Sequence, residues 1–197
     1  TPGNTNNTGS SKGSSGGSKT PTPAPAPAPA PVPTTPLASI AAPKVNVSTA
    51  NVTATADTAG NATASITEAQ MTAVIEQAKE TAKKNDGENQ VEIKVAAAAN
   101  SNKVETQIPQ KAIAEMGKSR LDGLTVSNPV ASVTFDAKAL ATIAGSASGD
   151  VKITASRVES SSLSEEAKKA VGDHPVFDFS VTIGDKNISA FGGNVTV

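Results

Sequence analysis

The 197-residue chain contains no cysteine, no tryptophan and no tyrosine, and only four phenylalanines. Without cysteine there is no disulfide framework, no thiolate metal site and no cysteine nucleophile. Without tryptophan and tyrosine, the chain lacks the exposed aromatic rings on which sugars and single-stranded nucleic acids usually stack. We expect all four phenylalanines to lie in the core, namely Phe135, Phe177, Phe179 and Phe191.

The chain also lacks a strong excess of either charge. Residues 44–197 carry 15 Lys and Arg against 18 Asp and Glu, without blocks of one sign. A nucleic-acid partner is not expected, because it would need a basic patch. No apolar run approaches the roughly 18 residues of a membrane span, and no basic-then-apolar signal segment opens the sequence.

Proline is scarce in most of the chain and concentrated near its start. Ten of the thirteen prolines lie within residues 1–43, most of them in the run PTPAPAPAPAPVPTTP over residues 21–36. Alternating proline favours an extended polyproline conformation, and the residues before this run are small and polar. We therefore predict a disordered tether over residues 1–43 and a single domain over residues 44–197. A tether at residue 1 indicates a piece of a longer protein.

Hydrophobic periodicity in residues 44–197 predicts an α+β domain of mostly antiparallel strands interleaved with three or four short helices. Residues 91–95 alternate apolar and polar side chains, as expected of a strand with one solvated face. Residues 104–108 repeat this pattern after a predicted turn at residues 100–102.

One helix has both a start signal and a buried face. Thr67 and Gln70 have the spacing of a capping box, and Ile66 and Met71 are placed as a hydrophobic staple. The predicted buried face consists of Met71, Val74, Ile75 and Ala78.

A strand-to-helix unit recurs along the domain. IPQKAIAEM at residues 108–116 aligns with FDAKALATI at residues 135–143, an offset of 27, and ITEAQMTAV from Ile66 has the same apolar spacing. In each copy, we expect the last apolar residue of a strand to contact the first turn of the next helix. Three units built alike predict one repetitive scaffold.

The last quarter of the domain predicts one more helix and three strands. The helix is expected in SLSEEAKKAVGD, capped by Ser162 with Glu165 three residues on, and ended by Gly172. Residues 177–183 then place alternate apolar side chains on one face of a strand. Gly192–Gly193, before the last short strand, is interpreted as a bulge or a tight bend.

Three segments of the domain carry a family resemblance: VEIKVAAAANSNKVETQIPQKAI, VASVTFDAKALATIAGSASGDVKITASRVESSSLSEEAKKAVGD and GDHPVFDFSVTIGDKNISAFGGNVTV. Together they resemble a module of large secreted proteins of Gram-positive bacteria, of the Paenibacillus and clostridial type. The most specific parts are Pro175–Phe179 and Phe191–Gly193. In that family the module usually follows Pro/Ser/Gly-rich linkers and precedes the S-layer homology repeats that hold the protein on the cell wall.

The resemblance covers residues 45–197 and implies an extracellular location, at the cell surface or in the cell wall. The S-layer homology repeats are absent from this sequence, so wall anchoring is not assigned to it. His174 stands where the family usually has Arg, and the family continues past Val197 into further strands. If those strands are missing, an exposed edge for strand exchange between subunits would comprise Asn194, Val195, Thr196 and Val197.

Candidate catalytic groups are few. The single histidine, His174, follows Asp173, but neighbouring residues of an extended segment point to opposite faces, so an orienter-and-base pair is not expected. The carboxylates fall on predicted helix faces or solvated strand positions, such as Glu76 and Glu92. The sequence has no phosphate loop, dinucleotide fingerprint or calcium loop. We therefore predict no catalytic, cofactor-binding or metal-binding residue.

One peptide bond is a candidate for self-cleavage. Asn128–Pro129 matches the dipeptide at which certain surface-exposed signalling proteins cleave themselves. The favoured interpretation is a turn between two strands.

These observations favour a non-enzymatic structural, spacer or assembly module of a secreted, S-layer-associated surface protein. Its expected partners are the other domains of the parent protein, or a second subunit through an edge strand. The alternative is a binding module for cell-wall polysaccharide or a substrate glycan, based on the proteins in which the family occurs. A self-cleaving signalling domain is the third hypothesis.

Overall fold

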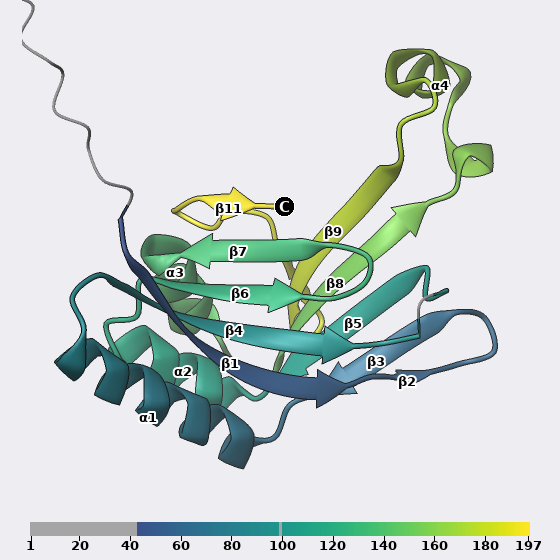
Figure 1. Ribbon diagram of the computed structural model, residues 1–197. Helices are drawn as coiled ribbons and strands as arrows, with labels where there is room; N and C mark the ends of the chain where they lie inside the picture. Colours follow the sequence, from purple (N-terminus) through teal and green to yellow (C-terminus); the bar gives the residue numbers. More distant parts are fainter. Residues whose placement is uncertain (1–42, 99) are drawn as a thin grey trace, which may run out of the picture. The chain divides into compact units, whose positions relative to one another are not determined.

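The computed structural model describes residues 43–98 and 100–197 (Figure 1). The predicted tether at residues 1–43 therefore lies outside the described residues, apart from its last position. The described residues contain four α-helices and eleven strands in two sheets, and most neighbouring strands are antiparallel. This confirms the predicted α+β class.

Sheet A has one buried face and one solvated face. Its strand order is β1 (Val45–Thr53), β4 (Glu88–Ala96), β6 (Gly123–Ser127), β7 (Ser132–Asp136) and β11 (Val195–Thr196). The first three strands are parallel, whereas β7 and β11 are antiparallel to their neighbours. Val91, Ile93 and Val95 of β4 are buried on one face, as the alternation predicted, and Lys94 is exposed on the other.

Sheet B contains a strand that directly continues the first strand of sheet A. Its strand order is β10 (Lys186–Ile188), β9 (Val176–Ile183), β8 (Val151–Val158), β5 (Lys103–Ile108), β3 (Asn61–Ser65) and β2 (Thr55–Ala56). Only Ala54 separates β1 from β2, so one nearly continuous strand passes from sheet A into sheet B. The successive strands β4 and β5 belong to different sheets.

Three of the four helices pack together. The helices are α1 (Glu68–Lys84), α2 (Gln110–Lys118), α3 (Ala137–Ser146) and α4 (Glu165–Val171), and a short 3-10 turn, η1, spans Ser160–Ser162. Helices α1 and α3 pack on strands of sheet A, and α2 lies against both of them (Figure 1). Helix α4 has no buried residue and lies at the tip of the long β8–β9 hairpin.

The predicted start of α1 is confirmed in detail. The Gln70 backbone N–H donates to Thr67 Oγ1 at 3.2 Å, and the Thr67 backbone N–H donates to Gln70 Oε1 at 3.0 Å, so the capping box closes. The buried residues of α1 are those predicted, Met71, Val74, Ile75 and Ala78.

The predicted repeat is also present. Helices α2 and α3 begin 27 positions apart, at Gln110 and Ala137. Ile66, Ile108 and Phe135 precede the three packed helices at equivalent positions and are all buried. Each strand therefore leads into its helix with an apolar anchor in the common core.

The predicted cap of α4 is wrong. Ser164, not Ser162, accepts the hydrogen bond from the Ala167 backbone N–H at 3.2 Å. Ser162 lies in η1, where its hydroxyl donates to the Glu159 carbonyl at 2.7 Å. The helix ends at Gly172, as predicted, with a positive φ of 57° that favours glycine.

The prediction that all four phenylalanines are core residues is wrong for Phe177. Phe135 is fully buried, and its ring centroid lies 6.0 Å from that of Phe179 and 5.9 Å from that of Phe191. Phe177 is 41% exposed and lies at the start of β9, at the end of the β8–β9 hairpin that is next to α4. The Arg157 guanidinium lies over its ring, 5.9 Å from the centroid.

Candidate functional site

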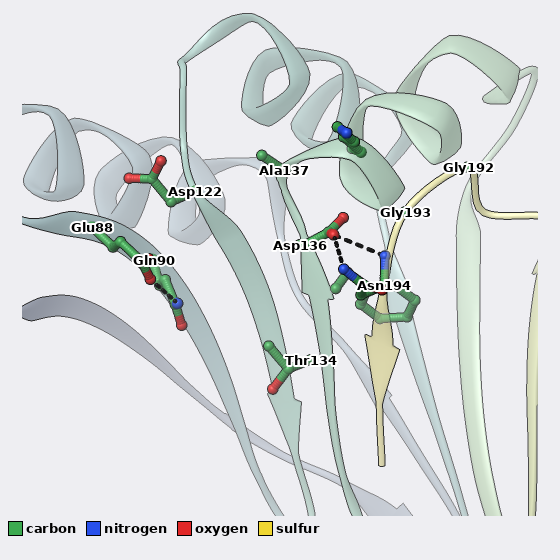
Figure 2. Close-up of a pocket in the computed structure, with 11 residues that line it drawn as sticks. Glu88, Gln90, Asp122, Thr134, Asp136, Ala137, Gly192, Gly193 and Asn194 are labelled. Carbon is green, nitrogen blue, oxygen red and sulfur yellow. Dashed lines mark hydrogen bonds between the residues drawn. The ribbon is translucent and has the colours of Figure 1, made fainter. Parts of the chain in front are cut away.

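A cavity of about 660 Å³ lies where strands of sheet A meet the start of α3 and the turn before β11 (Figure 2). Its charged lining residues are three carboxylates, Glu88, Asp122 and Asp136, and one lysine, Lys138. Carboxylates in a cavity are candidates for acid–base chemistry or cation binding, so the partners of each decide what it can do.

Asp136 ends β7 and caps α3. Its Oδ1 accepts from the Ala139 backbone N–H at 2.8 Å, and its Oδ2 accepts from the Asn194 backbone N–H at 2.8 Å and from Asn194 Nδ2 at 3.1 Å. These donors, the Ala139 N–H first and the Asn194 N–H second, hold the pKa of Asp136 below its usual range. The carboxylate is therefore ionised and engaged in the fold, which makes it a poor proton acceptor at neutral pH.

The predicted tight bend at Gly192–Gly193 is confirmed and has a steric reason. Gly192 has a φ of 66°, a conformation that favours glycine. A Cβ on Gly193 would lie 2.5 Å from the Ala139 nitrogen and 2.8 Å from Lys138 Cβ. Glycine therefore allows this turn to lie against the first turn of α3, where Asn194 reaches Asp136.

The other two carboxylates of the cavity also make contacts within the fold. Asp122 accepts from the Asn89 backbone N–H at 2.7 Å, while its own backbone N–H donates to the Asn89 carbonyl at 2.8 Å. Glu88 accepts from Gln90 Nε2 at 3.4 Å. Within residues 43–98 and 100–197, no group of three or more His, Asp or Glu side chains is arranged to hold a metal ion.

His174 and Asp173 do not line this cavity; both line a second cavity of about 320 Å³. It lies between α4 and the ends of β8 and β9, and Arg157 and Lys168 also line it. The His174 backbone N–H donates to the Val171 carbonyl at 3.2 Å, which ties the residue to the end of α4. This hydrogen bond therefore gives the His174 backbone a structural role.

Asn128–Pro129 forms the turn between β6 and β7, in agreement with the favoured interpretation. Asn128 Oδ1 accepts from the backbone N–H groups of Val130 at 2.9 Å and Ala131 at 3.1 Å. The Asn128 backbone N–H donates to the Ala131 carbonyl at 3.0 Å. The asparagine side chain thus organises the turn, as Asn commonly does.

The predicted exchange edge lies at the last strand of sheet A. Val195 pairs with Phe135 and Thr196 with Thr134, so β11 adds two residues to the edge of β7. Val197 is 64% exposed. Exchange of this segment between subunits stays a prediction.

A third cavity, of about 340 Å³, was not expected from the sequence. It is polar and is lined by Asn100, Ser101, Asn102, Pro129, Val130 and Arg157. The Ser101 hydroxyl is buried and has no hydrogen-bond partner among the described residues, and the residue as a whole is 8% exposed. The sequence indicated a turn at residues 100–102 but carried no sign that Arg157 faces it.

The contact between Asp136 and Asn194 was also not predicted from the sequence. An Asp at the end of a strand and before an Ala- and Leu-rich helix is a recognisable N-cap signal. The second partner, however, lies 58 positions later, and no local pattern links the two residues.

Comparison of the chain with protein-family models, curated proteins and solved structures gives no match. The resemblance to a surface module that precedes S-layer homology repeats therefore stays a prediction. None of the helices in the described part of the chain combines the length and apolar character needed to cross a bilayer.

Proposed function

We propose that residues 44–197 are a non-enzymatic structural and assembly module of a secreted bacterial cell-surface protein. The observation that supports this proposal most is that the two carboxylate oxygens of Asp136 accept three hydrogen bonds from other residues of the domain. The resemblance to S-layer-associated proteins supports the extracellular location, and the predicted tether at residues 1–43 supports a role as a spaced domain.

The contacts around α3 fit a mechanical role. Asp136 links β7, the start of α3 and the segment before β11, so the last strand is tied to the body of the domain. Phe135, the residue before it, anchors the same region in the core through Phe179 and Phe191. A spacer between neighbouring domains benefits from strands that are fastened in this way, because a loose terminal strand would yield first.

A second candidate function is glycan binding, and the polar cavity around Ser101 favours it. Side-chain amides of Asn100 and Asn102 and the guanidinium of Arg157 can donate hydrogen bonds to hydroxyl and carboxylate groups of a sugar. The buried Ser101 hydroxyl would gain a partner from such a ligand. Pro129 and Val130 supply an apolar wall.

An NMR titration distinguishes the two functions. Isotope-labelled chain is mixed with purified wall fragments or soluble glucans while the backbone amide shifts are followed. We expect a well-dispersed spectrum without localised, saturating shifts. Saturating shifts at residues 100–102 and Arg157, lost in Arg157→Ala but kept in Lys152→Ala on the same strand, would replace the structural function with glycan binding.

A further inference from the structure

The outer edge of β1 is the longest unpaired strand edge among the described residues. β1 has nine residues and pairs only with β4, whereas the other terminal strands of the two sheets, β2, β10 and β11, have two or three residues each. Natural sheets usually protect a long edge with charged residues, proline or a bulge. The β1 sequence, VNVSTANVT, contains no charged residue and no proline.

The backbone groups that this edge presents follow from two hydrogen bonds at the ends of β1. The Lys44 carbonyl accepts from the Glu88 N–H at 2.9 Å, and the Ala54 N–H donates to the Ala96 carbonyl at 2.8 Å. Even-numbered positions therefore point their backbone groups toward β4, and odd-numbered positions point away from it. The open edge presents the N–H and C=O groups of Val45, Val47, Thr49 and Asn51.

The C-terminal end of the edge is not available, because the chain turns there into sheet B. Thr55 pairs with Thr63 of β3 on the side of β1 that is opposite to β4. The open stretch is therefore residues 45–51, before the corner at Ala54.

A groove of about 210 Å³ lies between β1 and α1, beside the last three residues of this open stretch. Its lining residues are Thr49, Ala50, Asn51, Gln70, Ala73, Val74 and Gln77, none of them charged. Two charged residues of α1 form ion pairs with α2 instead of facing the groove. Glu68 pairs with Lys111 of α2, and Lys79 pairs with Glu115 of α2. Val45 and Val47 lie on the solvated face of sheet A and are 45% and 50% exposed.

The lengths of the unpaired strand edges indicate which partner strand fits the open stretch of β1. A second copy of this chain offers the terminal strands β2, β10 and β11, of two or three residues each, and five residues of β9 (176–180) that β10 does not cover, so only its β1 matches the open stretch in length. Pairing β1 with β11 of another copy would be head-to-tail and would join only two residues. Pairing β1 with β1 is self-complementary, closes as a dimer and places no like charges opposite each other.

We propose that the open edge of β1 pairs antiparallel with the same edge of a second copy, with Val45 opposite Asn51 and Val47 opposite Thr49. Sheet A then continues across a two-fold axis near Ser48, and the two α1 helices lie side by side on the same face of the joined sheet. Ala73, a small residue in the groove, permits their approach. This inference deepens the proposed function and rests on its assembly role.

Sedimentation equilibrium of the full 197-residue chain tests the proposal. Edge pairing buries a small area, so we expect a monomer–dimer equilibrium with a Kd between about 10 µM and about 1 mM. The weight-average mass should rise from 19.6 kDa toward twice that value as concentration increases. Amide exchange at Val47 and Thr49 should slow with concentration, whereas that at Ser48, whose N–H points to β4, should change little.

Two variants locate the interface. Val47→Pro removes an outward N–H without removing a bond to β4, and proline is tolerated at such edge positions. Thr49→Lys brings two lysines close together across the axis, while Glu92, which accepts from Thr49 Oγ1 at 3.3 Å, can pair with the lysine in the monomer. Each variant should weaken the dimer at least about tenfold, which corresponds to 1.4 kcal/mol.

The matched control is Thr63→Lys. Thr63 is exposed on β3 of sheet B and lies opposite Glu105, so the same substitution adds the same charge away from the β1 edge. The control should dimerise like the unmodified chain. Circular dichroism and thermal unfolding of all variants verify that they are folded.

Two outcomes would overturn the interface: a chain that stays monomeric up to about 1 mM, or a dimer that persists in both edge variants. A monomer that shows no glycan-induced shifts overturns the interface and leaves the structural function standing. A dimer that binds glycan at residues 100–102 overturns the proposed function and leaves the interface standing.

Discussion

Asn194 donates two hydrogen bonds to one oxygen of Asp136, from its backbone nitrogen at 2.8 Å and from its side-chain nitrogen at 3.1 Å, although 58 positions separate the two residues. In return, the Asp136 backbone N–H donates to the Asn194 carbonyl at 3.1 Å. The same carboxylate caps α3 through Ala139. One side chain therefore holds both the start of a core helix and the last strand of sheet A.

This relationship predicts a pH dependence of stability. The pKa of Asp136 in the folded chain lies below its ordinary value of 3.8. Its stabilising effect is therefore complete above that value and is lost as pH falls through the folded-state pKa. We expect unmodified chain and Asp136→Asn to differ in Tm by about 2–6 °C at neutral pH and to converge in acid.

Amide exchange distinguishes this contact from general acid destabilisation. Asp136→Asn should speed exchange of the Asn194 amide at neutral pH. The control is Asp57→Asn, in the turn before β3, where hydrogen bonds from Asn61 lower the pKa of Asp57. It should leave Asn194 unchanged. A Tm difference for Asp136→Asn that persists undiminished below the folded-state pKa would contradict the assigned role of the charge.

The crowding at Gly193 predicts a clear cost for a single methyl group. The Cβ of Gly193→Ala would meet the backbone nitrogen of Ala139, which cannot move without disturbing α3. We expect the free energy of unfolding to fall by about 1–3 kcal/mol in urea denaturation. Gly145→Ala is the matched control, because its Cβ would meet no atom within 4 Å and α3 would gain helix propensity. Equal effects at the two positions would refute the steric explanation.

The phenylalanines are predicted to contribute unequally. Phe135→Ala removes a fully buried ring that contacts two other rings, so we expect a loss of about 3–5 kcal/mol in the free energy of unfolding. Phe177→Ala should cost about 1 kcal/mol or less, because this ring is 41% exposed. Chemical denaturation of both variants measures the difference. Similar losses would mean that the β8–β9 hairpin is packed more tightly than its exposure indicates.

The Asn128–Pro129 turn is predicted to stay intact. Asn128 Oδ1 is engaged by two backbone N–H groups, which hold the side chain in the turn. After weeks at neutral pH, intact-mass spectrometry should show one species. Asn128→Ala, which lacks the side chain, gives the background level of fragmentation. A fragment that begins at Pro129 in the unmodified chain only would establish self-cleavage.

Several local features of the fold follow from the sequence. The capping box at Thr67 and the buried face of α1 were predicted residue by residue, as was the 27-residue spacing between α2 and α3. The capping box and the buried face depend on residues within one or two helical turns of each other, and the 27-residue spacing follows from a local strand-to-helix pattern that occurs twice. The cap of α4 was misplaced by two residues, because four serines in this segment offer similar capping groups and η1 uses Ser162.

The candidate sites were harder to predict from the sequence than these local features, because they depend more on tertiary structure. The turn at Asn128 was predicted, since Asn-Pro is a local signal. The cavity around Ser101 was not, because Arg157 reaches it from β8, more than 50 positions later. The open edge of β1 was missed for a similar reason: a strand pattern shows which side chains are buried but not which strand is terminal.

The sequence by itself determined the α+β class, the starts of the three packed helices and the alternating faces of the strands. These follow from helix caps and from hydrophobic periods of 3.6 and 2, which act between near neighbours in the chain. Only the tertiary structure decided that β4 and β5 lie in different sheets, that Phe177 lies beyond the core, that Asn194 binds Asp136 and that β1 ends sheet A. Each of these depends on contacts between distant segments, whose partners are selected by the packing of the whole core.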